Sequence, residues 1–219
     1  MYVYFNGDSD IKIIVSATSL GRYWNIKVAQ IGCDCPWKAP TGCLQYFTSL
    51  SGTVNNFNYG TLINVNTVNQ LIGPDIVAVP GTRQMANENY GVCVQVQPGY
   101  CSIQWSQGSD STSFTVTNNT ALEEAIYVLP GGPLKGENCT TDYVVIPNPY
   151  YTNGTAIDGD RFCGNQFITL VSSSKPFIMT VVTNNDEVDD IANRGFSLDY
   201  AQQACATDSN NVALVLAMG

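Results

Sequence analysis

Short stretches of alternating apolar and polar residues recur along the chain and predict β-strands. They are rich in β-branched and aromatic residues and are bounded by Gly, Pro, Asn or Ser. The clearest are residues 11–15, 24–28, 92–96, 102–105, 114–116, 143–146, 177–182 and 196–200. Brief helices are expected only at residues 65–72 and 187–192. The pattern therefore predicts an all-β fold, an antiparallel β-sandwich with one buried face per strand.

The composition indicates the size, location and partner class of this sandwich. The 219 residues are 44% hydrophobic, enough for one large domain or one domain plus part of another. Charged residues make up 12%, about half of the roughly 25% typical of globular proteins. A surface built from Asn, Thr, Ser, Gln and Tyr is typical of extracellular β-proteins and excludes a Lys/Glu-rich helical bundle. The net charge of -9 repels phosphates, so we expect no nucleic-acid partner.

The cysteines indicate an oxidising compartment. The chain has eight cysteines but no His and no Cys-x-x-Cys element, which favours disulfides over zinc. Glycosylation sequons begin at Asn118, Asn138 and Asn153. Three sequons together with eight cysteines predict an extracellular glycoprotein, either secreted or an ecto-domain.

The two ends of the sequence carry no targeting or anchoring signal. The first ten residues lack the basic and apolar regions of a signal peptide. No apolar run approaches the roughly 20 residues that span a bilayer, so this chain is expected to contain no transmembrane segment. We therefore expect the chain to be a fragment of a longer polypeptide, the alternative being a gene model that has lost both ends.

One internal similarity bears on domain organisation. Residues 25–33 align with residues 197–205, since both read apolar-x-apolar-Ala-Gln-x-x-Cys. One interpretation is that residues 1–34 are the C-terminal fragment of a preceding domain of the same type. The main domain would then occupy residues 35–205, followed by a tail at 206–219. The alternative is a chance agreement between two unrelated edge strands.

The stretch from Cys139 to Cys205 resembles the second half of a CUB domain. Its motifs Cys-x-x-Asp-Tyr, Arg-Phe-Cys-Gly, Ser-Ser-Ser-Lys-Pro-Phe and Gly-Phe-Ser-Leu-Asp-Tyr follow in the family's order, at residues 139–143, 161–164, 172–177 and 195–200. Upstream, residues 39–47, 89–93 and 99–103 resemble the divergent CUB-like proteins of arthropods. The resemblance covers about residues 35–205, with a long insertion between Gly52 and Glu88, and implies a CUB-like jelly roll.

The resemblance also implies two disulfides, Cys139–Cys163 and Cys43–Cys93. For the first there is an independent argument: the enclosed loop is rich in Pro and Gly and cannot form a continuous ladder. A bridge across a loop of this size stabilises the fold by roughly 3 kcal/mol. The partners of the remaining cysteines stay open: Cys33, Cys35, Cys101 and Cys205.

Many CUB domains hold calcium, and the resemblance points to a candidate set of ligands. Asp142 matches the Asp of Cys-x-x-Asp, and Asn184, with Asp186 two residues on, stands in the loop before Gly-Phe. The remaining acidic position falls on Leu134, while Glu137 is out of register. Hard cations require several oxygen ligands. Because this set is incomplete, we expect Asp142 to form local hydrogen bonds and the protein to need no cofactor.

The sequence contains no set of residues that indicates an enzyme. The absence of His excludes a Ser-His-Asp triad and the usual zinc hydrolase sites. Residues 172–175 match Ser-x-x-Lys, but Pro176 and a β-run follow where a helix is required. We expect a non-enzymatic module that binds an extracellular protein or glycan through its loops, in which several Tyr residues lie. The alternatives are the accessory region of a larger secreted enzyme, such as a protease, and a structural matrix protein.

Overall fold

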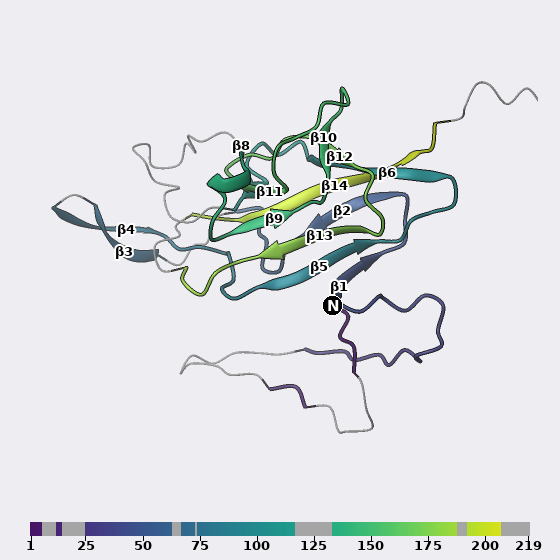
Figure 1. The fold of residues 1–219 in the computed structure, drawn as a ribbon. Coiled ribbons are helices and arrows are strands. Elements are labelled where there is room, and N and C mark those ends of the chain that lie inside the picture. Colours follow the sequence, from purple (N-terminus) through teal and green to yellow (C-terminus); the bar gives the residue numbers. More distant parts are fainter. Residues whose placement is uncertain are drawn as a thin grey trace, which may run out of the picture.

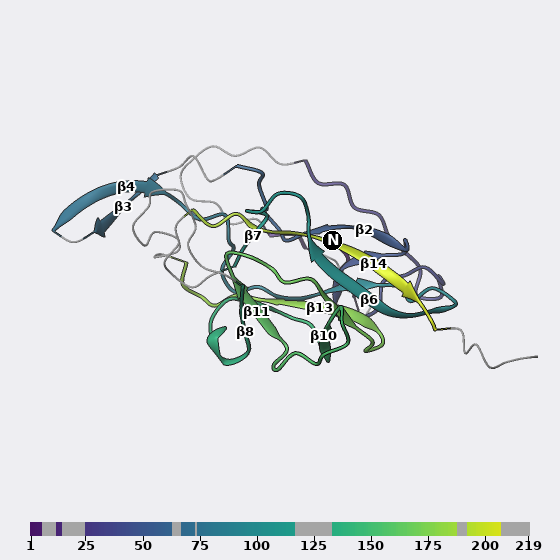
Figure 2. The ribbon, with the colours of Figure 1, turned by 90° about the horizontal axis from the view of Figure 1, so that it is seen from above.

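The computed structural model of the chain describes residues 1–5, 12–14, 25–62, 67–72, 74–116, 133–187 and 192–206. Between Cys43 and Ala204 these residues form two packed six-stranded sheets and a separate hairpin (Figures 1 and 2). Within the described residues the one helical element is the 3-10 turn η1 (Gly136–Asn138). The predicted all-β sandwich is confirmed.

The first sheet contains six strands that come from the whole length of the domain. Its order is β1 (Cys43–Phe47), β5 (Asn89–Val94), β13 (Phe177–Val182), β9 (Tyr143–Val145), β11 (Arg161–Gly164) and β8 (Pro133–Lys135). Strand β1 runs parallel to β5, and all the other pairs are antiparallel. The two edges are therefore β1 and β8.

The second sheet is centred on the long final strand. Its order is β10 (Pro149–Tyr151), β12 (Leu170–Ser172), β6 (Tyr100–Gln107), β14 (Gly195–Ala204) and β2 (Ser51–Asn55), and the short β7 (Phe114–Thr115) pairs with the start of β14. All of these pairs are antiparallel. Strand β14 thus lies between β6 and β2, and the edges are β10 and β2.

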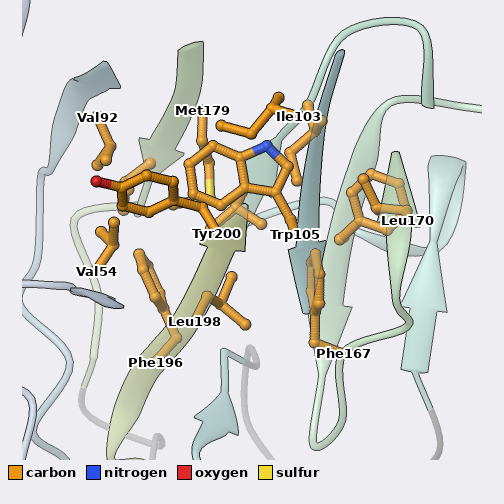
Figure 3. Packing of buried hydrophobic residues seen from close by; sticks show 14 of the residues in the cluster. Val54, Val92, Ile103, Trp105, Phe167, Leu170, Met179, Phe196, Leu198 and Tyr200 are labelled. Carbon is orange, nitrogen blue, oxygen red and sulfur yellow. The ribbon is translucent and has the colours of Figure 1, made fainter. Parts of the chain in front are cut away.

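Alternation along the strands builds the core between the two sheets. In β13 every second residue from Phe177 is buried, and β14 follows the same period of two. Figure 3 shows Trp105 and Tyr200 from the second sheet packing toward Met179 and Val92 from the first. The rings of Trp105 and Tyr200 lie 5.9 Å apart between centroids. This shared interior fixes the sheets face to face and leaves the loops at the two ends of the sandwich.

Three disulfides tie the sandwich together. They are Cys43–Cys93, Cys101–Cys205 and Cys139–Cys163, with Cα–Cα distances of 5.6, 4.8 and 5.7 Å. The first and third are the pairs that the family resemblance implied. The second joins the start of β6 to the end of β14 and was left open by the sequence. Cys33 and Cys35 are free thiols.

The insertion before β5 forms a hairpin that projects from the sandwich (Figures 1 and 2). It consists of β3 (Thr67–Ile72) and β4 (Asp75–Pro80), paired from Thr67↔Pro80 to Ile72↔Asp75. The predicted helix over 65–72 is therefore wrong for residues 67–72. Both segments are rich in β-branched residues, which favour strands, and Pro74, directly before β4, disfavours the continuation of a helix. Most of the second predicted helix, at 187–192, lies outside the described residues.

The N-terminal residues do not contribute a strand to either sheet. Residues 25–30 are irregular, as are residues 12–14, so the strands predicted at 24–28 and 11–15 are wrong for these described parts. The backbone amide of Tyr2 donates to the carbonyl of Leu44 on β1 at 2.7 Å. A strand requires a neighbour to pair with, and none of the described residues pairs with residues 25–30. The division into residues 1–34, 35–205 and 206–219 stays a prediction, and most of the tail lies outside the described residues.

Candidate functional site

Six loops meet at one end of the sandwich, which we call the Asp142 end: residues 56–62, 82–88, 108–113, 139–142, 183–187 and 192–194. Strand register brings them together. Tyr143 pairs with Val182, which also pairs with Asn89, so the loops next to β9, β13 and β5 are neighbours. Leu198 pairs with both Val54 and Gln107, which places the loops next to β14, β2 and β6 at the same end. The β3–β4 hairpin leaves the sandwich between two of these loops (Figure 1).

Asp142 is buried and accepts hydrogen bonds from neighbouring loops. Its Oδ1 accepts from the backbone amide of Asn184 at 2.9 Å, and its Oδ2 from the Thr141 hydroxyl at 3.2 Å. The side chain of Gln84 also hydrogen-bonds it. Burial raises the pKa of Asp142 above its ordinary value, and the three hydrogen bonds offset part of that rise. Asp142 therefore joins three segments of the chain at this end.

Gln84 extends this network to a second carboxyl group. Its Nε2 donates to Oε2 of Glu187 at 3.0 Å, so one buried amide links Asp142 and Glu187. In the adjacent loop the Thr183 hydroxyl donates to the carbonyl of Met85 at 2.6 Å and accepts from the backbone amide of Glu88 at 2.9 Å. These contacts hold loops 82–88 and 183–187 side by side.

The candidate calcium ligands Asp142, Asn184 and Asp186 are hydrogen-bonded to one another and to neighbouring loops. Asp142 is engaged by three donors, and Oδ1 of Asn184 accepts from the backbone amide of Asp186 at 2.7 Å. Among the described residues no three His, Cys, Asp or Glu side chains group as a metal-binding cluster. A calcium ion requires six to eight oxygen ligands around one point. The expected local hydrogen bonding of Asp142 is present, and the absence of a bound calcium ion stays a prediction.

A second network, centred on Arg194, was not predicted from the sequence. The side chain is 6% exposed. Its Nε donates to the carbonyl of Gly60 at 2.8 Å and its Nη2 to the Tyr59 hydroxyl at 2.9 Å. Nη2 also forms an ion pair with Oδ2 of Asp110 at 2.7 Å, and Nη1 donates to the Thr112 hydroxyl. The guanidinium hydrogen bond lowers the pKa of Asp110 to about 2, so this pair stays ionised well into acid.

The backbone around Arg194 explains how the network is positioned. Gly195 has a φ of +78°, and a Cβ there would lie 2.2 Å from Oδ1 of Asn56, so only Gly fits. That oxygen accepts from the backbone amide of Phe196 at 2.7 Å. The partners of Arg194 lie 82 to 135 residues away in sequence, which is why spacing could not reveal them. A lone Arg before a Gly-Phe strand, in a chain with nine basic residues, was the available signal.

The outer surface of the Asp142 end combines apolar and acidic side chains. Leu62 is 72% exposed and Met85 is 42% exposed. The carbonyl of Leu62 accepts from Nε of Arg83 at 2.8 Å, which joins the loop that ends at Leu62 to the loop that contains Met85. Loops of the same end contribute two acidic residues, the exposed Asp186 and the half-buried Glu88, whose pKa is raised by burial, whereas the Glu187 carboxylate is engaged by Gln84.

The remaining sequence candidates lie apart from this surface or serve the fold. Ser172 donates its hydroxyl to the carbonyl of Pro147, and Lys175 donates to the carbonyl of Tyr100, so the Ser-x-x-Lys residues are engaged with backbone. Tyr90 is buried and Tyr59 is held by Arg194. The sequon residues Asn138 and Asn153 are exposed, whereas Asn118 lies outside the described residues. In the part of the chain that the structure describes, no helix is long and apolar enough to cross a membrane.

Comparison with known proteins gives the same family that the motifs indicated. The family model described as the animal CUB domain matches residues 40–203. Among solved structures, the full extracellular region of zebrafish Gpr126/Adgrg6 is 17% identical, with a TM-score of 0.37 over 75% of this chain and 15% of that one. The CUB1-EGF-CUB2 domains of rat MASP-1 are 14% identical, with a TM-score of 0.37 over 73% of this chain and 40% of that one. The chain thus spans less than half of either structure. The comparison with curated proteins found no match.

Proposed function

Because the chain belongs to the animal CUB domain family, whose domains are interaction modules of extracellular proteins, we propose that it binds a protein partner through the Asp142 end. The partner presents basic and apolar side chains. Basic groups pair with Glu88 and Asp186, and apolar groups cover Leu62 and Met85. The binding is non-enzymatic and takes place outside the cell.

The observation that carries this proposal is that the loops of the Asp142 end are held by buried hydrogen bonds and present exposed apolar and acidic side chains. Asp142, Gln84 and Arg194 hold the loops in place by buried hydrogen bonds, so little loop ordering is left to oppose binding. Exposed apolar side chains within a polar rim are typical of protein interfaces. A chain of net charge -9 also attracts basic partners at long range.

A protein partner is favoured over a glycan because the aromatic side chains of this end are engaged internally. The Tyr59 ring lies 5.5 Å from the Arg194 guanidinium and its hydroxyl accepts from the same group. Tyr90 is buried against Phe57, with ring centroids 4.8 Å apart. Neither ring is presented flat to solvent for stacking on a sugar. The same surface could serve in the accessory region of a secreted enzyme or in a matrix protein. These two alternatives differ from the proposal only in what the rest of the polypeptide or assembly does.

The test is a binding screen on paired variants. The purified chain is immobilised and probed in parallel with an array of extracellular proteins from the same animal and with a glycan array. We expect a protein binder whose affinity falls at least about 10-fold, or roughly 1.4 kcal/mol, in Asp186→Lys and in Met85→Ser. Calcium and EDTA arms of the same assay report whether the binder depends on calcium.

Matched controls lie at the opposite end of the sandwich. Asp158→Lys makes the same change of charge on an exposed loop, and Leu50→Ser removes an exposed apolar side chain. Both are expected to leave the affinity within about 2-fold, because mutations outside an interface are near neutral. A binder lost only in the control variants, binding to glycans alone, or no binder on either array would each contradict the proposal.

A further inference from the structure

Strand β14 gives a physical role to each position that residues 25–33 share with residues 197–205. Leu198 and Tyr200 are in the core, 0% and 2% exposed. The small Ala201 pairs with Ser51 on one side and Gln104 on the other. Cys205 closes the strand through its disulfide with Cys101 on β6. The shared pattern therefore specifies the last strand of this sandwich rather than any alternating strand.

The Gln of the pattern has the most specific task. Gln202 is buried, and its Nε2 donates to the carbonyls of Ser49 at 3.2 Å and Gln95 at 2.9 Å. Its Oε1 accepts from the backbone amide of Gln97 at 3.0 Å. One side chain thus fastens loops 48–50 and 95–99 at the end of the sandwich opposite Asp142, which we call the Gln202 end.

Residues 25–33 have the pattern without the surroundings. Ile26 and Val28, the counterparts of Leu198 and Tyr200, are 53% and 63% exposed. Gln30 is exposed, and Cys33 is an exposed free thiol. Other apolar side chains of the N-terminal described residues are exposed as well, namely Val3, Phe5, Ile13, Ile14 and Ile31. So much exposed apolar surface in a strand pattern indicates a missing partner.

We propose that residues 25–33 are the last strand of a second CUB-like sandwich, the rest of which is supplied by residues that precede Met1 in a longer polypeptide. Ile26 and Val28 enter the core of that sandwich, and Gln30 fastens two of its loops as Gln202 does here. Cys33 forms a disulfide with a cysteine on the strand equivalent to β6. The inference does not depend on the binding surface proposed above.

A second copy of this chain cannot supply the missing sandwich. In this domain the place of the last strand is taken by β14, which is paired on both sides, with β6 and with β2. The cysteine on β6 is likewise taken, because Cys101 is bonded to Cys205. The partner must therefore be a sandwich that lacks its own final strand and has an unpaired cysteine on the neighbouring strand.

The disulfide forms by thiol–disulfide exchange in the secretory pathway. Two thiols each lose one hydrogen, and the two electrons reduce the disulfide of a protein oxidoreductase to a dithiol. The Cys33 thiol is exposed and is accessible to this exchange.

Peptide mapping of the protein purified from its animal source, without reduction, tests the proposal. Trypsin releases residues 28–38, and cleavage before Asp34 separates Cys33 from Cys35. We expect the Cys33 peptide to be linked to a peptide that is absent from the 219 residues and that sequencing of the transcript places upstream in the same polypeptide. The Cys101–Cys205 link in the same digest is the internal control.

The other outcomes overturn the proposal. They are a Cys33–Cys35 bond, a link between two copies of the 28–38 peptide, a link to a different polypeptide, and a Cys33 that is alkylated without reduction. None of these results depends on whether a partner binds the Asp142 end.

Discussion

The two ends of the sandwich are each closed by one buried polar side chain beside or within β14, but the chemistry differs. At the Asp142 end the side chain is the cation Arg194, which holds Gly60, Tyr59 and Asp110. At the Gln202 end it is a neutral amide, next to the Cys101–Cys205 disulfide. Because only the first of these side chains is charged, we expect pH and salt to affect the stability of the Asp142 end more than that of the Gln202 end. The end that responds to charge is also the end we propose for binding.

The largest effect is expected from removing the cation. Arg194→Met leaves the carbonyl of Gly60 and the hydroxyls of Tyr59 and Thr112 without their donor in a buried place. We expect the free energy of unfolding in urea to fall by about 2–4 kcal/mol. Arg83→Met is the control at the same end, since Arg83 is half-buried and its Nε donates to the carbonyl of Leu62, and it should cost about 1 kcal/mol. An equal fall in the free energy of unfolding in the two variants would show that Arg194 stabilises this end no more than Arg83 does.

A smaller effect is expected at the opposite end. Gln202→Leu keeps the side chain's size but leaves the Gln97 amide and the carbonyls of Ser49 and Gln95 unsatisfied. The loss should be about 1–3 kcal/mol and, because no titrating group is involved, the same at pH 4 and pH 7. Gln30→Leu is the matched control and should leave the stability of the 219-residue chain unchanged, since Gln30 is exposed. A loss that grows with pH would contradict the neutral character of this end.

Lowering the pH should weaken the Asp142 end and leave the Gln202 end unaffected. Asp110 has a pKa lowered from 3.8 to about 2 in the fold, so it contributes stability above pH 3.8 that is lost as pH falls toward 2. Asp110→Asn should cost about 1 kcal/mol at pH 7, because the carboxyl is 46% exposed and solvent screens the pair. This difference from wild type should shrink as pH falls to about 2. Thermal unfolding between pH 2 and pH 7 measures it, and a constant difference would exclude the ion pair as its cause.

The smallest effect concerns the other aspartate and has the opposite sign. Burial raises the pKa of Asp142 in the fold, so wild type loses stability as pH rises from 3.8 through the raised value. Asp142→Asn has no such titration. Relative to wild type, its melting temperature should therefore rise between pH 4 and pH 7, whatever the offset at one pH. A difference that moves the other way would mean that the hydrogen bonds to Asp142 outweigh its burial.

Much of the sandwich could be predicted because the apolar, β-branched and aromatic residues that form its core mark the strands in the sequence. The run Phe177–Val182, rich in β-branched residues, is strand β13 to the residue, and its side chains are alternately buried although five of the six are apolar. The run 196–200 lies inside β14, which extends from Gly195 to Ala204. The same alternation at 24–28 gave a wrong prediction, because a pattern records which face a strand would bury and cannot show that a partner is present.

The functional end was less predictable, since it depends on contacts between distant residues. Asp142 was found through its motif, yet its donor Asn184 lies 42 residues away and acts through its backbone amide, which has no sequence signature. Arg194 and Asp110, 84 residues apart, form the one ion pair among the described residues. The helix expected over 65–72 failed for a different reason. A short apolar segment fits either period, and the helix-breaking Pro74 that follows it in the sequence was the better guide.

The edges of the two sheets bear on how the domain behaves at high concentration. An unpaired edge invites another chain to add a strand and start a fibre. Strands β8 and β10 each contain a proline, Pro133 and Pro149, which lacks the amide hydrogen that such an addition needs. The outer side of β10 is also covered by its own chain, since Tyr150 bridges to Ala156 and the amide of Ile157 donates to the carbonyl of Pro149. Two of the four edges are therefore guarded against the addition of a strand from another copy.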